Sequence, residues 1–175
     1  ILKAMNRKHT ADDYLRVLGR VRAAQPDILL TSDFIVGFPG ETEAEFQQLI
    51  DWLEEAQLDR VGAFKYSPVE GARANEVAPH VAPEIQEERL ARFMQVAQRI
   101  SAARLAQRVG QEETVLVDGH EGNVAIARTR GDAPEIDGVV RIKRGASLPV
   151  GEFARVTLTA ADDYDFEAVP KENPS

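Results

Sequence analysis

The residues best suited to chemistry surround one glycine-proline turn. The segment reads Asp33-Phe34-Ile35-Val36-Gly37-Phe38-Pro39-Gly40-Glu41. Two glycines flank Phe38-Pro39, so the backbone can turn sharply and come close to a small molecule. We interpret Gly37, Gly40 and Glu41 as part of a binding site, and we expect Asp33 to point toward that site from the end of the preceding strand.

Two alternatives explain the same residues without a ligand. On spacing alone, a well-made strand-to-helix turn accounts for the glycines equally well. Asp33 also suits the role of a capping or turn-stabilising carboxylate. The turn therefore indicates a site only in combination with other features of the chain.

Several kinds of site are excluded by composition. The chain has 175 residues and no cysteine, which rules out disulfides, thiol nucleophiles and cysteine-ligated metal or iron-sulfur sites within it. Its three histidines, His9, His80 and His120, are far apart in sequence, so we expect surface roles and no metal site. No Ser-His-Asp, paired-carboxylate or Walker-type arrangement is present.

Hydropathy and the first residues bear on where the chain works. No apolar run approaches the roughly 20 residues that span a bilayer, and the first residues are too polar for a secretory signal. We therefore expect no membrane segment and a cytoplasmic location. Because the chain does not begin with methionine, we also expect it to be a piece of a longer protein.

The elements that position the turn alternate between helix and strand. Apolar spacing and capping residues predict helices over 11–24, 42–57 and 84–109, and strands over 28–36 and 60–67. Thr42 caps the second helix, and Glu45, three residues on, completes a capping box. The alternation implies parallel strands joined by right-handed crossovers. The arginines of the last helix interleave with glutamates, which favours a solvated face over a nucleic-acid stripe.

The character of the chain changes after Gly110. Five short apolar segments separated by Gly, Asp and Pro turns predict a small β-barrel, so we place the domain boundary between 1–109 and 110–175. The strands are expected over residues 114–118, 123–128, 138–143, 152–160 and 164–169.

Charge also differs between the two parts. Residues 1–109 carry 14 Lys/Arg and 16 Asp/Glu, whereas residues 110–175 carry 7 and 13. An acidic barrel favours a basic protein as partner and disfavours RNA, whose phosphates need a positive surface. An RNA role stays open because five cations are available for a local basic patch: Arg128, Arg130, Arg141, Lys143 and Arg144.

Three separated segments resemble one family, the radical S-adenosylmethionine methylthiotransferases. Residues 32–42 are similar to the segment after that family's fifth strand, 64–72 to its sixth-strand motif, and 132–138 to a motif of its C-terminal TRAM barrel. The resemblance covers nearly the whole chain, in order. It implies an α/β plus all-β fold: the C-terminal part of a radical-SAM partial (βα) barrel, lacking the first four strands, followed by a five-stranded TRAM (OB-like) barrel.

The resemblance is strongest to the branch that inserts a methylthio group into an aspartate side chain of a small-subunit ribosomal protein. The tRNA-modifying branch usually has an arginine in the loop after the Tyr-Ser pair, whereas this chain has Val69-Glu70. A change from cation to anion suits a basic protein substrate better than a polynucleotide. On this basis the substrate-binding residues are expected to be Glu70, Asp132, Glu135 and Asp137.

The resemblance also implies cofactors. The full-length enzyme would hold S-adenosylmethionine and two 4Fe-4S clusters, and this chain, having no cysteine, would ligate neither cluster and would be inactive alone. Lys65 and Tyr66 become further cofactor-binding candidates, although strand alternation lets only one of them face the site. The alternatives are a tRNA adenosine methylthiotransferase and a non-catalytic adaptor.

Overall fold

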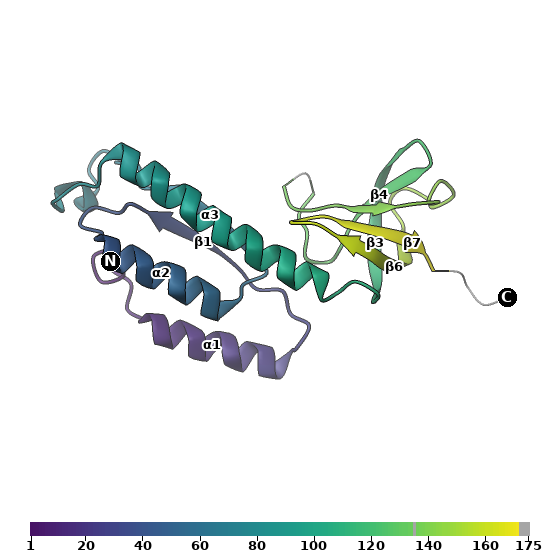
Figure 1. The fold of residues 1–175 in the computed structure, drawn as a ribbon, viewed down its shortest axis with the longest axis horizontal. Helices are drawn as coiled ribbons and strands as arrows, with labels where there is room; N and C mark the ends of the chain where they lie inside the picture. The colour runs from purple at the N-terminus through teal and green to yellow at the C-terminus, as the bar shows by residue number, and fades with distance from the viewer. Residues whose placement is uncertain (135, 172–175) are drawn as a thin grey trace. The chain divides into compact units, whose positions relative to one another are not determined.

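A computed structural model describes residues 1–134 and 136–171 of the chain. The chain divides into two compact units, residues 1–100 and 101–175 (Figure 1). The first unit is α/β and the second is a β-barrel, as the sequence predicts. No helix of the described residues is both long and apolar enough to cross a bilayer.

The first unit alternates helices and strands. Its sheet has two parallel strands, in which Asp33 lies opposite Gly62 and Ile35 lies opposite Phe64. The pairing confirms that the two strands are parallel, as predicted. In chain order the elements are α1 (Ala11–Ala24), β1 (Thr31–Val36), α2 (Glu43–Ala56), β2 (Arg60–Lys65), a short 3-10 helix (Arg73–Glu76) and α3 (Pro83–Ala106).

Capping residues begin the first two helices. At α2, the Thr42 hydroxyl accepts a hydrogen bond from the Glu45 amide at 3.2 Å, and the Glu45 carboxylate accepts one from the Thr42 amide at 2.8 Å. This is the predicted capping box, which satisfies two otherwise unpaired amides of the helix end. Thr10 and Asp13 form the same arrangement at the start of α1.

The helices cover one face of the two-stranded sheet. Phe34 and Val36 of β1 pack with Phe46 of α2 and Phe93 of α3. Because side chains alternate along a strand, the residues between them face the other way. On that opposite face Ile35 is 44% exposed and Phe64 is 60% exposed. We call this face, defined by Asp33, Ile35, Gly62 and Phe64, the open face.

Several predicted boundaries differ from the structure, among them the start of the first strand and the end of the long helix. The first strand begins at Thr31 and not at residue 28, because the Leu30 amide donates to the Asp59 carboxylate at 2.9 Å and the Leu30 carbonyl accepts from the Asp59 amide. The long helix ends at Ala106 and not at 109. Turns follow it, up to Gly110, whose φ is +87° and whose amide donates to the Leu158 carbonyl.

The second unit confirms the predicted five-stranded barrel. The strands close in the order β3-β4-β5-β7-β6, and all pairs are antiparallel except β5 with β7. Leu105, from the last turn of α3, packs into the barrel core with Val115, Val156 and Phe166. The strands are β3 (Glu112–Glu121), β4 (Val124–Arg128), β5 (Val140–Ile142), β6 (Phe153–Ala161) and β7 (Phe166–Pro170).

Candidate functional site

The glycine-proline turn lies directly after β1 and has the left-handed backbone that glycine permits. Gly37 has φ +68° and Gly40 has φ +84°. The Gly37 amide donates to the Glu41 carboxylate at 3.0 Å, and the Gly40 amide donates to the Pro79 carbonyl at 2.8 Å. Both amides are thus paired within the protein, so they add no free donors toward a ligand.

The space that the two glycines leave is filled by the protein itself. A Cβ at Gly37 would lie 2.5 Å from Cγ of Gln86, and one at Gly40 would lie 3.5 Å from a methyl group of Val77. The close backbone approach that the sequence predicts therefore occurs, but its partners at these two positions are Gln86 and Val77. A ligand would meet the edge of this turn and not a cradle between its glycines.

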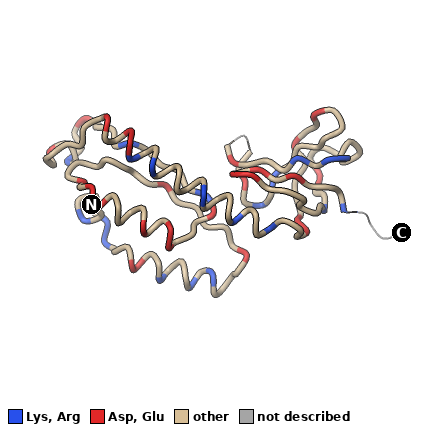
Figure 2. The backbone as a smooth tube through the Cα atoms, viewed as in Figure 1, with Lys and Arg blue, Asp and Glu red and all other residues tan. Residues whose placement is uncertain are grey.

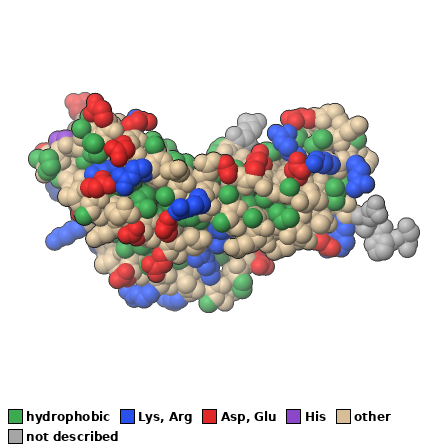
Figure 3. Space-filling view, viewed as in Figure 1, with side chains coloured by type: hydrophobic (Ala, Val, Ile, Leu, Met, Phe, Trp, Pro, Cys, Tyr) green, Lys and Arg blue, Asp and Glu red, His purple; other side chains and the backbone are tan. Residues whose placement is uncertain are grey.

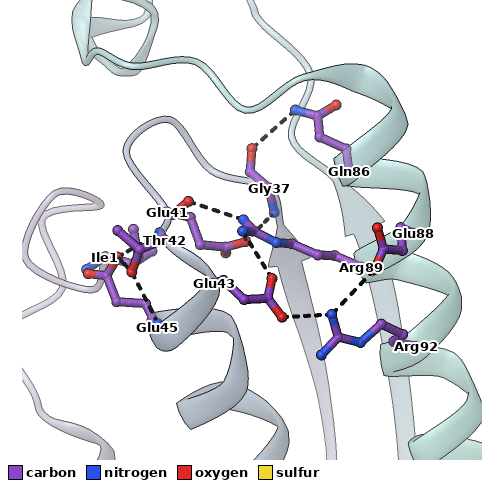
Figure 4. Close-up of polar contacts among 10 residues, drawn as sticks. All are labelled: Ile1, Gly37, Glu41, Thr42, Glu43, Glu45, Gln86, Glu88, Arg89 and Arg92. Carbon is purple, nitrogen blue, oxygen red and sulfur yellow. Dashed lines mark hydrogen bonds and ion pairs between the residues drawn. The ribbon is translucent and has the colours of Figure 1, made fainter.

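Glu41 turns inward (Figure 4). Its side chain is 3% exposed and pairs at 2.7 Å with Arg89 of α3, whose side chain is 6% exposed. Burial raises the pKa of Glu41 above its ordinary value, while the hydrogen bonds from Gly37 and Arg89 act in the opposite direction. The structure thus gives the Glu41 carboxylate a role inside the turn, and its contact with a cofactor stays a prediction.

Arg89 makes several contacts with this region. Its guanidinium donates to the Glu41 carbonyl at 3.1 Å and lies 3.4 Å from a Glu43 carboxylate oxygen. It also stacks over the Phe46 ring, 5.5 Å from the ring centroid. Its Nε is buried with no partner among the described residues. One buried cation therefore joins α3 to the turn and to the first residues of α2.

Sequence reasoning missed Arg89 and Gln86. It assigned the arginines of the long helix to a solvated face, and for Arg89 that interpretation is wrong. Figure 2 shows acidic and basic positions mixed along α3, so charge pattern alone does not single it out. The available signal was spacing: residues 86, 89, 93, 97 and 100 recur at helical intervals, and Phe93 and Ile100 are core residues.

Asp33 lies on the open face. It is the third residue of β1, three residues before the strand ends, and its side chain is exposed. A Cβ at Gly62 would lie 2.4 Å from its carboxylate oxygen, so the missing side chain at Gly62 leaves room for Asp33. With Ile35 and Phe64 on the same face, Asp33 forms a polar group on a partly apolar surface. This combination of one polar group and apolar neighbours is typical of small-molecule sites.

The side chains of Lys65 and Tyr66 point in different directions, as strand alternation requires. Lys65 forms an ion pair with Glu87 of α3, which directs it toward the helices and away from the open face. Tyr66 follows β2. Its ring packs edge-on against Phe38 at 5.2 Å, and its amide donates to the Val36 carbonyl at 2.9 Å. Of the two, Tyr66 is the one next to the turn.

The loop that carries Glu70 is held by Asn75. The Tyr66 hydroxyl donates to the Asn75 side chain at 2.6 Å, and the Asn75 amide group donates to the Val69 carbonyl at 2.7 Å. Glu70 is exposed and Val69 is 66% exposed. This loop therefore presents an acidic side chain beside an apolar one to solvent.

Of the three acidic candidates in the barrel, two shape their own loop. The Asp132 carboxylate accepts from the Thr129 hydroxyl at 2.5 Å, and the Asp137 carboxylate accepts from the Ala133 amide at 2.7 Å. Both side chains are half-buried, and Ile136 between them is 83% exposed. Glu135 lies outside the described residues.

The candidate basic patch of the barrel is largely neutralised. Arg128 pairs with Asp118 at 2.7 Å, Arg141 with Glu121 at 2.8 Å, and Lys143 with Glu167 at 2.6 Å. Figure 3 shows basic and acidic side chains close together on the visible face of the barrel. Within residues 1–134 and 136–171, no group of three or more His, Cys, Asp or Glu side chains is placed to hold a metal ion.

The two units match two known protein families. Residues 1–53 match the radical SAM superfamily, and residues 109–170 match the TRAM domain. These matches agree with the α/β unit and the closed barrel described above.

Curated relatives are similar along the whole chain. The chain is 51% identical to the ribosomal protein uS12 methylthiotransferase of Saccharophagus degradans over 99% of its length, and 55% identical to that of Bordetella petrii over 94%. It is 53% identical to that of Methylococcus capsulatus over 96%. The chain spans only 36%, 37% and 38% of these three proteins, respectively.

Proposed function

We propose that this chain, which belongs to the radical SAM methylthiotransferase family, is part of an enzyme that inserts a methylthio group into an aspartate side chain of a small-subunit ribosomal protein. One observation carries the proposal: identity of 51–55% over 94–99% of the chain to proteins named as ribosomal protein uS12 methylthiotransferases. Because the chain spans less than two fifths of those relatives, the activity is proposed for the full-length protein.

Radical SAM chemistry in the full-length enzyme requires S-adenosylmethionine and 4Fe-4S clusters. Since the chain contains no cysteine, it ligates no cluster through thiolates. When bound, the cofactor and clusters supply the radical that removes hydrogen from the target carbon, and the methyl group that caps the sulfur. The contribution of this chain is to bind, to orient and to exclude water.

The open face and the adjoining edge fit this task. Ile35 and Phe64 offer apolar surface at 44% and 60% exposure, Asp33 offers a carboxylate, and Gly62 leaves space beside it. The turn that begins at Gly37 follows the carboxyl end of β1, and Tyr66 follows the carboxyl end of β2. Parallel sheets bind ligands at these ends. We place S-adenosylmethionine over Asp33 and Ile35, with Tyr66 and the edge of the Gly37–Gly40 turn beside it.

The acidic barrel is proposed as the dock for the ribosomal protein. Its net negative charge and its paired cations favour a basic protein over a polynucleotide. Asp132, Asp137 and the exposed Ile136 present charge and apolar surface together, and Glu135 lies between them in sequence. Glu70, which belongs to the first unit, is proposed as a further substrate contact. A ribosomal target also implies a cytoplasmic location.

The deciding experiment uses the full-length gene, expressed with iron and sulfur supply in cells that lack their own methylthiotransferases. We expect a methylthio increment on one small-subunit ribosomal protein by intact mass, and unmodified tRNA nucleosides. Methylthiolated adenosine with unchanged ribosomal proteins would establish the tRNA alternative instead. No modification of either class, in protein that carries its clusters, would support the adaptor alternative.

The cofactor position has its own test. In the full-length protein with its clusters, Asp33→Ala is expected to raise the Kd for S-adenosylmethionine about tenfold, the cost of one lost hydrogen bond to a charged group. Asp51→Ala is the matched control, because Asp51 is exposed on α2 and bonds Gln47 on the same helix. Equal affinities in wild type and the Asp33 variant would remove Asp33 from the proposed site.

A further inference from the structure

Two side chains of α3 reach the glycine-proline turn from the start of that helix. Gln86 donates from its side-chain amide to the Gly37 carbonyl at 3.1 Å, and Arg89 donates to the Glu41 carbonyl at 3.1 Å and to its carboxylate at 2.7 Å. Figure 4 shows both side chains extending from α3 toward the turn. The turn is thus held at its first and last residues by a helix that follows it by almost fifty positions in the sequence.

We propose that Arg89 and Gln86 are positioning residues for S-adenosylmethionine: they contact no cofactor, but they fix the turn that borders its site. The inference rests on the proposed function, since it assigns a task to residues behind the same cofactor site. The sequence and the family resemblance point to the turn alone, whereas the structure adds the residues that hold it.

Arg89 is suited to hold a single arrangement of the turn. Its side chain is 6% exposed, and the Glu41 carboxylate that it pairs with also accepts from the Gly37 amide at 3.0 Å. A chain of contacts therefore runs from the guanidinium through Glu41 to Gly37. Removing the cation would leave a buried carboxylate without its ion-pair partner, which favours a rearranged turn over the original one.

Gln86 acts on the other end of the turn by shape as well as by hydrogen bonding. A Cβ at Gly37 would lie only 2.5 Å from Cγ of Gln86, so the Gln86 side chain fills the space beside this glycine. The positive φ of Gly37 and the contact with Gln86 together fix the direction in which the chain leaves β1. Shortening Gln86 would leave a gap and release the Gly37 carbonyl.

Movement of the turn would displace residues of the proposed cofactor site. The turn begins directly after Ile35 and Val36 of β1, and the Val36 carbonyl accepts from the Tyr66 amide at 2.9 Å. Phe38 of the turn also packs on the Tyr66 ring at 5.2 Å. A displaced turn would therefore shift Tyr66 and the end of β1 together, which are the parts placed next to S-adenosylmethionine.

The test measures S-adenosylmethionine binding to the full-length protein with its clusters, by titration calorimetry, alongside thermal unfolding. Arg89→Met is expected to raise the Kd about tenfold and Gln86→Leu about threefold, while Arg89→Lys, which keeps the charge, recovers part of the loss. The matched control is Arg92→Met. Arg92 pairs with Glu43 and stacks over Phe46 as Arg89 does, but its other hydrogen bonds go to Glu88 and Gln47, outside the turn.

The outcomes separate positioning from simple stabilisation. A lower Tm for Arg89→Met with an unchanged Kd would overturn the inference, as would equal Kd changes in the Arg89 and Arg92 variants. If Arg89→Met does not fold, Gln86→Leu decides by the same comparison. A wild-type protein that carries its clusters and fails to bind S-adenosylmethionine would contradict the proposed function itself. A wild type that binds, with variants of equal affinity, would contradict this inference alone.

Discussion

Asp33 and Gly62 lie opposite each other in the two parallel strands, and the side chain of Asp33 uses the space that Gly62 leaves. A carboxylate on a strand surface needs room beside it, and glycine supplies that room because it has no Cβ. The pair places the polar group of the open face on the same surface as the apolar side chains of Ile35 and Phe64, which lie opposite each other. At this scale, the position of one functional group depends on the absence of a neighbouring side chain.

Gly62→Ala tests that dependence. The new Cβ would lie 2.4 Å from the Asp33 carboxylate, so the flexible side chain has to rotate away. We expect the Kd for S-adenosylmethionine to rise about three- to tenfold, with no further rise from Gly62→Ala in an Asp33→Ala background. Additive effects in that double-mutant cycle would mean that Gly62 acts through something other than Asp33.

A second residue-scale prediction concerns Asp162, in the turn between β6 and β7. Its carboxylate accepts from the amides of Asp165 at 2.8 Å and Tyr164 at 3.0 Å, and these hydrogen bonds hold its pKa below the ordinary 3.8. A depressed folded-state pKa adds stability that is present above pH 3.8 and lost as the pH falls through the folded-state pKa.

We therefore expect Asp162→Ala to lower the free energy of unfolding by about 0.5–1 kcal/mol at neutral pH. The difference between wild type and variant should shrink as the pH falls below 3.8, because the protonated carboxyl no longer accepts both hydrogen bonds as an anion. Urea unfolding at neutral pH and at about pH 3 measures both differences. A difference that is the same at both pH values would show that the hydrogen bonds do not depend on the charge.

At the level of the elements, the first turn of α2 joins a capping box to a core residue. Thr42 and Glu45 close the capping box, and Phe46, the next residue, is a buried core side chain that also lies under Arg89 and Arg92. The start of the helix thus sets the position of a core aromatic residue and of the cations above it.

Thr42→Ala is expected to destabilise the protein by about 1 kcal/mol, because it removes the hydroxyl that accepts from the Glu45 amide. Thr42→Ser keeps a hydroxyl and should stay within about 0.5 kcal/mol of wild type. Thermal and urea unfolding of the three proteins measures this. Equal losses in both variants would assign the effect to the threonine methyl group and not to the cap.

For the molecule as a whole, α3 is shared between the two compact units. Its residues up to Ile100 belong to the first unit, and its last turns belong with the barrel, where Leu105 is 5% exposed in the core. The sequence placed the boundary after residue 109, and the position of Leu105 supports a barrel unit that begins earlier.

Leu105→Ala is therefore expected to destabilise the barrel unit by about 2–4 kcal/mol, the usual cost of a large-to-small core substitution. A fragment of residues 101–175 should likewise be more stable to urea than one of residues 110–175. Leu2→Ala, at an apolar side chain that is 36% exposed, is a control with a small expected effect in the longer protein. Equal stability of the two fragments would favour the boundary at 109.

The sequence by itself determined the features that depend on near neighbours. The capping box at Thr42 and the five short barrel strands follow from residues a few positions apart, because helix ends, alternation and turns are local. The parallel pairing of β1 with β2 follows from the order of helices and strands along the chain. The turn at Gly37 was also recognisable, since its glycines are needed for a positive φ.

The tertiary structure alone decided what lies against that turn. Whether Arg89 is solvated or buried, and whether the space at Gly37 receives a ligand or Gln86, depends on how a helix some fifty residues away packs on the strand end. The same packing sends Lys65 toward Glu87 and leaves Asp33 on the open face. Helical spacing places Gln86 and Arg89 on the same face of α3 as the core residue Phe93, but it does not tell which distant segment they contact. Those contacts are known only once the helices are in place.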